Sequence, residues 1–158
     1  MIGILRQYYD AVGAEATHVG GTIKDQAGDG VLILVGAPIA MDDHALGAME
    51  LAKRIRDRGM ALTARWTEQG QKLGVGVGVA TGLVTVGVLG AGPRLEYAAV
   101  GPAVNLASPL CAEAAHGQVL VDERTREIVG ENASYKVVFV GALNLKGYRD
   151  PVPSFMLS

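Results

Sequence analysis

A chain of 158 residues is long enough for one domain with a real core and too short for two. Hydrophobic residues make up 49% of it and charged residues 19%, a balance that excludes a disordered chain. The formal net charge is only -2, so the composition shows no excess of positive charge of the kind that binds nucleic acid. The single cysteine, Cys111, excludes an internal disulfide and favours a reducing, cytoplasmic compartment. Because it lies in an apolar helical pattern, we expect Cys111 to be a small core residue.

The apolar runs of the sequence are short and divided by glycines. None approaches the roughly 18 residues of a membrane-spanning helix, so no membrane segment is expected in this chain. The first residues show no basic segment followed by an apolar one and predict no signal peptide. The 22 glycines interrupt apolar runs instead of gathering in a linker. This distribution indicates tight turns and close approaches between backbone segments.

The first predicted elements are a helix and a hairpin. Apolar residues at helical spacing predict a helix from Ile4 to about His18, which two glycines end. Two short strands are predicted at Thr22–Gln26 and Val31–Val35. They are joined by Gly28-Asp29-Gly30, and an Asp-Gly pair between such runs is a strong hairpin signal.

A long helix and a second pair of strands follow. Asp42 or Asp43 is predicted to cap the helix, which ends near Gly70. The segments 73–82 and 83–90 are predicted to be the two strands of a second hairpin. Glycine at every other position of the first strand leaves one face as bare backbone. Such a face suits close contact with a helix, a second chain or a ligand.

The rest of the chain alternates between short strands and helices. These elements are predicted at Tyr97–Val100 (strand), Pro102–Ala115 (helix), Gln118–Val121 (strand), Glu123–Val129 (helix), Tyr135–Val140 (strand) and Val152–Leu157 (strand). Paired strands between helices predict an α+β fold with helices packed against one face of a sheet. Because no interior linker or low-complexity tract is visible, residues 1–158 are predicted to form a single domain.

Three stretches carry a resemblance to a known family: GGTIKDQAGDGVLILVGAP at 20–38, VGVGVATGLVTVGVLGAGPRLEYAAVGPAVNLAS at 75–108 and LKGYRDPVPSFML at 145–157. In this order and spacing they resemble the class III adenylate/guanylate cyclase catalytic domains over almost the entire chain. The resemblance implies a ferredoxin-like nucleotidyl cyclase fold, with a mainly antiparallel sheet and helices packed on it. It also implies a head-to-tail dimer with active sites at the interface.

The resemblance assigns roles to four residues. In this family the 3'-hydroxyl of ATP or GTP attacks its own α-phosphate and releases pyrophosphate, assisted by Mg²⁺ or Mn²⁺. Asp29 matches the second of two metal-binding aspartates, and Asn105 matches the asparagine that orients the ribose and the transition state. Arg94 and Lys146 match phosphate contacts. Without the resemblance, Asp29 would be read as a turn residue, and Arg94 and Lys146 as solvent-facing charges.

Three other positions depart from the family pattern. Asp25, four residues before Asp29, and Ala98, seven before Asn105, stand where the family reads the purine base. We therefore expect any nucleotide binding to be weak and nearly indifferent to the base. Pro109, four residues after Asn105, stands where the family has an arginine that stabilises the transition state. Proline has neither a charge nor a donor, and such a loss costs on the order of 10³–10⁵ in rate by analogy with arginine fingers.

A further expected departure concerns the start of the fold. The family has a central first strand, which ends in the first metal-binding aspartate, and we expect this chain to lack that strand. A single carboxylate is poorly able to hold two magnesium ions. The strands that flank the empty position would keep unpaired backbone groups, so we expect the chain to dimerise, exchange an element or rearrange its sheet.

Three functional interpretations follow. The first is a cyclase-type domain of cyclic-nucleotide signalling with little or no turnover by itself, acting as a pseudo-cyclase or dimerisation module in a homodimer or heterodimer. The alternative is one half of an active cyclase, which makes cAMP or cGMP plus pyrophosphate with a complementary partner chain. The third is a ferredoxin-like domain that binds RNA or a small regulator. Against RNA, only 5% of the residues are aromatic and no basic strand carries stacking residues.

Overall fold

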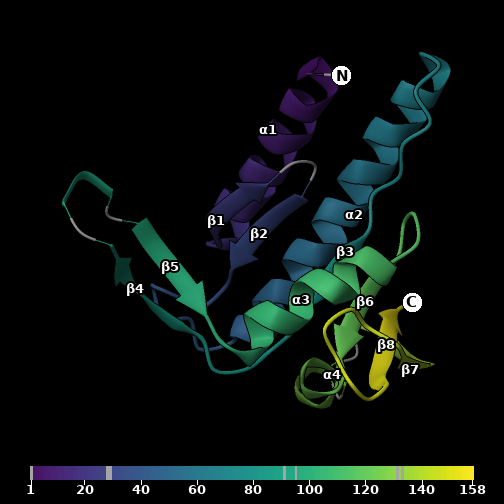
Figure 1. Ribbon diagram of the computed structural model, residues 1–158. Coiled ribbons are helices and arrows are strands. Elements are labelled where there is room, and N and C mark those ends of the chain that lie inside the picture. Colours follow the sequence, from purple (N-terminus) through teal and green to yellow (C-terminus); the bar gives the residue numbers. More distant parts are fainter. Residues whose placement is uncertain (1, 28–29, 91, 95, 131, 133) are drawn as a thin grey trace.

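The computed structural model describes residues 2–27, 30–90, 92–94, 96–130, 132 and 134–158 (Figure 1). Its elements, in chain order, are α1 (Ile2–Val19), β1 (Thr22–Ala27), β2 (Gly30–Leu34), α2 (His44–Glu68), β3 (Val77–Val79), β4 (Thr85–Leu89), η1 (Gly92–Arg94), β5 (Glu96–Val100), α3 (Pro102–Glu113), β6 (Val119–Asp122), α4 (Glu123–Val129), β7 (Val137–Leu143) and β8 (Val152–Leu157). The predicted helices and strands are therefore present, most of them within a few residues of their predicted bounds.

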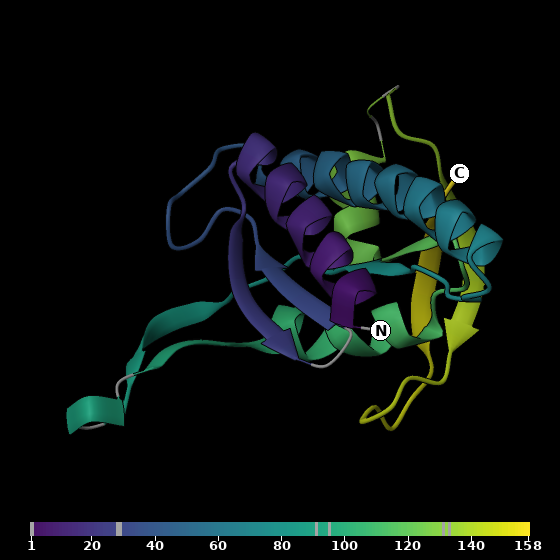
Figure 2. The same ribbon diagram turned by 90° about the horizontal axis from the view of Figure 1, so that it is seen from above.

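The two long helices α1 and α2 lie side by side above the strands (Figures 1 and 2). Asp43 occupies the N-cap position of α2, as predicted, although its side chain makes no capping hydrogen bond. The inward stripe of α2 includes Met49 and Ile55, both buried, while charged side chains line its outer face. No helix in the described ranges combines the length and the apolar character needed to cross a membrane.

Among the described residues, the strands form three separate sheets. The hairpin β1–β2 and the hairpin β4–β5 are each two-stranded and antiparallel. The third sheet has the strand order β3-β6-β8-β7, in which β3 and β6 are parallel and the other pairs are antiparallel. Helices and mainly antiparallel sheets thus combine into the α+β architecture that the sequence predicts.

The predicted second hairpin is wrong. β3 does not pair with β4; it pairs in parallel with β6, and β4 pairs with β5. The physical reason lies in the two connections. The reversal that β4 needs comes after it, where Gly90 and Gly92 take positive φ values of 108° and 62°. The connection before β4 is instead fastened to α4, because the Thr81 and Thr125 hydroxyl groups lie 2.7 Å apart.

Helices cover both faces of the four-stranded sheet, so the prediction of helices on one face is also wrong. On one face, Val79 of β3 belongs to a core cluster with Met49 of α2 and Val129 of α4. On the other face, Leu110 of α3 packs with Leu120 of β6. The sequence offers the reason in β6, whose four residues are all buried, as expected for a strand that is covered on both sides.

The glycine-lined face of β3 contacts a helix, one of the three partners that the sequence suggested. A Cβ atom on Gly78 would lie 2.5 Å from the carbonyl oxygen of Ala107, and one on Gly76 would lie 2.9 Å from the Cβ of Ala114. α3 therefore rests directly on the strand backbone. Cys111, expected in the core, is exposed, and its thiol donates a hydrogen bond of 3.4 Å to the carbonyl oxygen of Gly76.

We expect Gly78→Ala to lower the free energy of unfolding by about 1–3 kcal/mol, because the new methyl group would meet backbone atoms that cannot rotate away. Gly87→Ala, in a strand position with nothing within 4 Å of the added atom, is the matched control and should change stability by about 0.5 kcal/mol or less. Urea unfolding followed by circular dichroism measures both. Equal effects of the two substitutions would contradict the close approach of α3.

The β1–β2 hairpin and the four-stranded sheet share a core without sharing hydrogen bonds. Val31 and Ile33 of β2 and Val77 of β3 pack against one cluster formed by α1 and α2. Within the described part of the chain, however, β2 pairs only with β1, and β3 pairs only with β6. Each strand therefore has an edge whose backbone N–H and C=O groups lack a strand partner, and such edges favour pairing with another chain.

We therefore expect the purified chain to self-associate through the edges of β2 and β3. Sedimentation should show dimers or larger species whose fraction rises with concentration. Amide exchange in β2 and β3 should slow over the same range, while exchange in β6, which is paired on both sides, serves as the internal reference. A monomer at every concentration, with fast exchange in β2 and β3, is the contrary result.

Candidate functional site

Helix α3 holds Asn105 on its outer face. The helix begins after Gly101, whose φ of 150° suits glycine, and it has proline in its first turn. The backbone N–H of Asn105 donates a hydrogen bond of 3.1 Å to the carbonyl oxygen of Gly101. Strand β3 lies against Ala107 and Cys111, which project from other sides of the helix. The Asn105 side chain is consequently exposed, on an element fixed by its contact with the sheet.

Pro109 lies one turn after Asn105 on the same side of α3 and is half-buried. Because proline has no N–H, it cannot donate the helical hydrogen bond that the carbonyl oxygen of Asn105 would otherwise accept. The 12 residues of α3 also contain no lysine or arginine. The helix therefore offers a ligand the side-chain amide and the free backbone carbonyl oxygen of Asn105. It offers no positive charge that could bind a phosphate.

The two predicted base-reading positions lie on neighbouring strands. Ala98 of β5 is half-buried, and its backbone faces Gly87 of β4 in the hairpin register. Asp25 lies in β1 opposite Leu32, and its side chain is outside the described part. β5 contacts both β1 and α3, so the backbone brings Asp25, Ala98 and Asn105 onto adjoining elements. Neither alanine nor glycine has a side-chain donor or acceptor, so the Ala98–Gly87 pair offers a base no side-chain hydrogen bond.

The two candidate phosphate contacts lie in different parts of the fold. Arg94 ends η1, at the far end of the β4–β5 hairpin, which projects from the body of the molecule (Figures 1 and 2). Its side chain is outside the described part. Lys146 is exposed in the turn between β7 and β8. Its neighbour Leu145 is buried against Leu110 of α3, so this turn lies beside α3 while η1 does not.

The candidate metal ligand, Asp29, falls outside the described residues. Within the described residues, no three His, Cys, Asp or Glu side chains come together as they would to hold a metal ion. The side chains that the structure places therefore do not form a site that fits Mg²⁺ or Mn²⁺, which require several oxygen ligands. The role of Asp29 stays a prediction.

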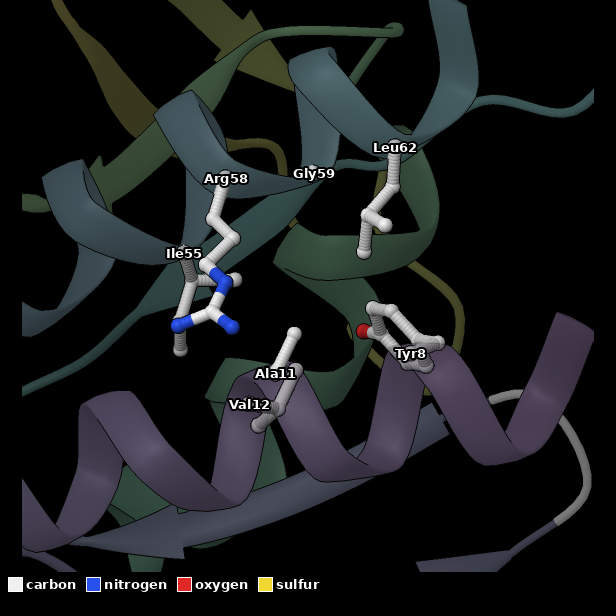
Figure 3. A pocket seen from close by; sticks show the side chains of 7 residues that line it. All are labelled: Tyr8, Ala11, Val12, Ile55, Arg58, Gly59 and Leu62. Atoms are coloured by element: carbon white, nitrogen blue, oxygen red, sulfur yellow. The ribbon is translucent and has the colours of Figure 1, made fainter. Parts of the chain in front are cut away.

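A hollow between α1 and α2 does not belong to this group of residues (Figure 3). It is lined by Tyr8, Ala11, Val12, Ile55, Arg58, Gly59 and Leu62. All of these come from the two helices, and only Arg58 carries a charge. The hollow therefore lies within the packing interface between α1 and α2.

A buried polar cluster that the sequence did not reveal positions the start of α3. Asp122 caps α4: its Oδ1 accepts hydrogen bonds from the backbone N–H of Thr125 at 3.1 Å and from the Thr125 hydroxyl. Since that hydroxyl has one proton, Thr81 must be the donor in the 2.7 Å contact with it. The cluster fastens the loop that leads from β3 to β4, and the carbonyl group of Leu83 in this loop abuts Gly101.

The pKa of Asp122 provides a test of this cluster. Burial raises its pKa above the ordinary value of 3.8, against the opposing effect of the hydrogen bonds from Thr125 and Thr81. The folded state thus binds this proton more readily than the unfolded chain. The resulting stabilisation is complete below the ordinary pKa and is lost as pH rises through the raised pKa.

We compare the free energy of unfolding of the wild-type chain with that of Asp122→Asn. The wild-type value minus the variant value should fall as pH rises from about 4 through the raised pKa of Asp122. The asparagine oxygen can still accept from Thr125, so the variant should fold. Urea unfolding at a series of pH values measures the difference, with Asp57→Asn, an exposed carboxyl, as the matched control. A difference between wild type and Asp122→Asn that stays constant with pH would rule out the raised pKa.

A model of the adenylate and guanylate cyclase catalytic domain matches residues 4–158. An uncharacterized protein of Mycobacterium tuberculosis is 29% identical over 153 residues, which cover 96% of this chain and 26% of that protein. The adenylyl cyclase CyaB from P. aeruginosa is 27% identical with a TM-score of 0.88, covering 99% of this chain and 81% of that one. The guanylyl cyclase Cya2 is 32% identical with a TM-score of 0.85, covering 99% and 79%.

These likenesses extend over nearly all of this chain but not over the whole of its relatives. The chain spans about a quarter of the length of the first curated relatives that it matches. The superposition on solved cyclase structures confirms the α+β fold predicted from the three sequence stretches.

Proposed function

The chain belongs to the adenylate and guanylate cyclase catalytic domain family, and from that premise we propose that it is a cyclase-fold module with little or no turnover by itself. In this proposal it serves cyclic-nucleotide signalling by pairing with a second cyclase-type domain, either another copy or a different chain. ATP or GTP is the class of ligand that its remaining site residues would contact.

The observation that carries this proposal is the outer face of α3. Asn105 is exposed there, yet Pro109 one turn later supplies neither charge nor donor, and the helix has no lysine or arginine. Cyclisation places developing negative charge on a phosphate, which fixed cationic groups must stabilise. A helix that keeps the orienting amide but lacks the cation is suited to holding a nucleotide better than to converting it.

The projecting β4–β5 hairpin supports pairing with a second domain. Val88 and Val100 in this hairpin are 63% and 54% exposed, and Leu83, which precedes it, is 89% exposed. Apolar side chains on a projecting arm are typical of surfaces that another protein covers. The arm also carries Arg94 away from α3 of its own chain, so in a head-to-tail pair this cation would be available to the other chain.

We expect the purified chain, given ATP or GTP with Mg²⁺ or Mn²⁺, to form no cyclic nucleotide above a blank without protein. The physical reason is the missing cation on α3, whose loss costs on the order of 10³–10⁵ in rate. Product would be measured by chromatography.

Calorimetry on the same samples should show ATP and GTP binding with nearly equal affinity, since Ala98 and Gly87 offer no side-chain hydrogen bond to the base.

Turnover that Asn105→Ala or Asp29→Ala abolishes would contradict this proposal, provided that both variants keep the wild-type circular dichroism spectrum. Turnover that arises only after a second cyclase domain is added would favour the alternative, one half of an active enzyme. A strong preference for one base would show that residues other than Asp25 and Ala98 read it.

A further inference from the structure

Five charged or polar side chains form a continuous series of hydrogen bonds across α1, α2 and the segment before β7. Glu15 of α1 accepts from Arg54 at 3.3 Å and from Arg58 at 3.2 Å, both on α2. Arg54 also donates from Nε to Glu50 at 2.9 Å. Glu50 in turn accepts from the Tyr135 hydroxyl at 3.0 Å. Residues 120 positions apart in sequence, Glu15 and Tyr135, are thereby connected through two side chains of α2.

The connections are in series, because each carboxylate uses a different oxygen for each donor. Glu15 accepts through Oε2 from Arg54 and through Oε1 from Arg58. Glu50 accepts through Oε1 from Arg54 and through Oε2 from Tyr135. Arg54 is the only group that touches both carboxylates among these five. Within this series, a movement of Glu15 therefore reaches Tyr135 through Arg54.

Two features keep this series intact in the folded state. The Glu15 side chain is only 14% exposed, so it cannot simply turn out into water. Burial and the hydrogen bond to Glu50 raise the pKa of Tyr135 to about 12, so its hydroxyl remains a donor at neutral pH. The same hydrogen bond from Tyr135, followed by that from Arg54, lowers the pKa of Glu50, which therefore remains an acceptor.

Both ends of the series lead to elements that bear candidate site residues. At one end, Val12 and Ala16 of α1 pack over Ile23 of β1, the strand that contains Asp25. At the other end, Tyr135 precedes β7, and β7 leads into the turn that contains Lys146. Beside the ion pairs, the hollow between the helices includes the small residues Ala11 and Gly59 (Figure 3). Arg58 lines this hollow and also donates to Glu15, so the first ion pair of the series lies at the contact between the two helices.

We propose that the series Arg58–Glu15–Arg54–Glu50–Tyr135 couples the seating of α1 on α2 to the β7–β8 hairpin, so that a contact that shifts α1 is felt at the Lys146 turn. The coupling is a property of the folded chain alone. It goes beyond the proposed function and does not depend on nucleotide binding or turnover.

Hydrogen exchange read by mass spectrometry tests the coupling. Glu15→Gln weakens the two ion pairs at α1 and keeps the side-chain shape. We expect amide exchange to accelerate about two- to fivefold in α1 and also in the first residues of β7, the factor that corresponds to losing a partly exposed ion pair. Asp57→Asn, which removes the neighbouring Arg56–Asp57 pair on the same helix, is the matched control and should leave β7 unchanged.

Reciprocity sharpens the test, since a coupling free energy acts equally in both directions. Tyr135→Phe removes only the hydroxyl and should accelerate exchange in α1. The double variant should accelerate exchange no more than the larger single effect, because both changes interrupt one series.

Three results would overturn the proposal: an effect of each variant confined to its own element, additive effects in the double variant, or equal acceleration in β6. The last would indicate general destabilisation, because β6 lies at the centre of the core.

Discussion

The backbone of β3 touches the backbone of α3, and much of the fold depends on this contact. It exists because Gly76 and Gly78 present no side chain on that face, and any Cβ at Gly78 would meet the helix backbone. The valines that alternate with them face the other way, into the core under α2. One short strand therefore packs helices on both of its faces, and the position of Asn105 follows from the spacing of glycines in a strand that precedes it in the sequence.

Helix α3 combines a rigid position with a weakened interior. Pro109 removes the donor that would complete the hydrogen bond to Asn105, and this commonly loosens a helix. The contacts of Leu110 with β6 and with Leu145 offset that loss from the buried side. Tertiary packing, not helix propensity, thus keeps Asn105 in place.

Local patterns in the sequence predicted local structure well. The strands that flank Asp29, the helix after Asp43 and the strand–helix pair around Asp122 all depend on signals within a few residues. Pairing between distant segments was not predictable in this way, since nothing near β3 indicates that β6 is its partner. The contact of Thr81 with Thr125 spans 44 positions and leaves no local signal. The roles predicted for Asn105, Arg94 and Lys146 rest only on the resemblance, because no local sequence pattern around these three residues indicates a nucleotide site.

The positions of the candidate cations bear on the proposed pairing of this domain with a second one. Helix α3 contains no lysine or arginine, and Lys146 lies in a turn that packs beside this helix. Arg94 lies at the far end of the β4–β5 hairpin, which projects away from the body of its own chain. Under the proposed pairing, a phosphate held beside Asn105 would meet the cation of the β4–β5 arm only from a second chain. The attraction between such charges and a phosphate falls steeply with distance and with salt. If the domain pairs in this way, nucleotide affinity should follow dimerisation, because the surface that joins the two chains would also supply the missing charge.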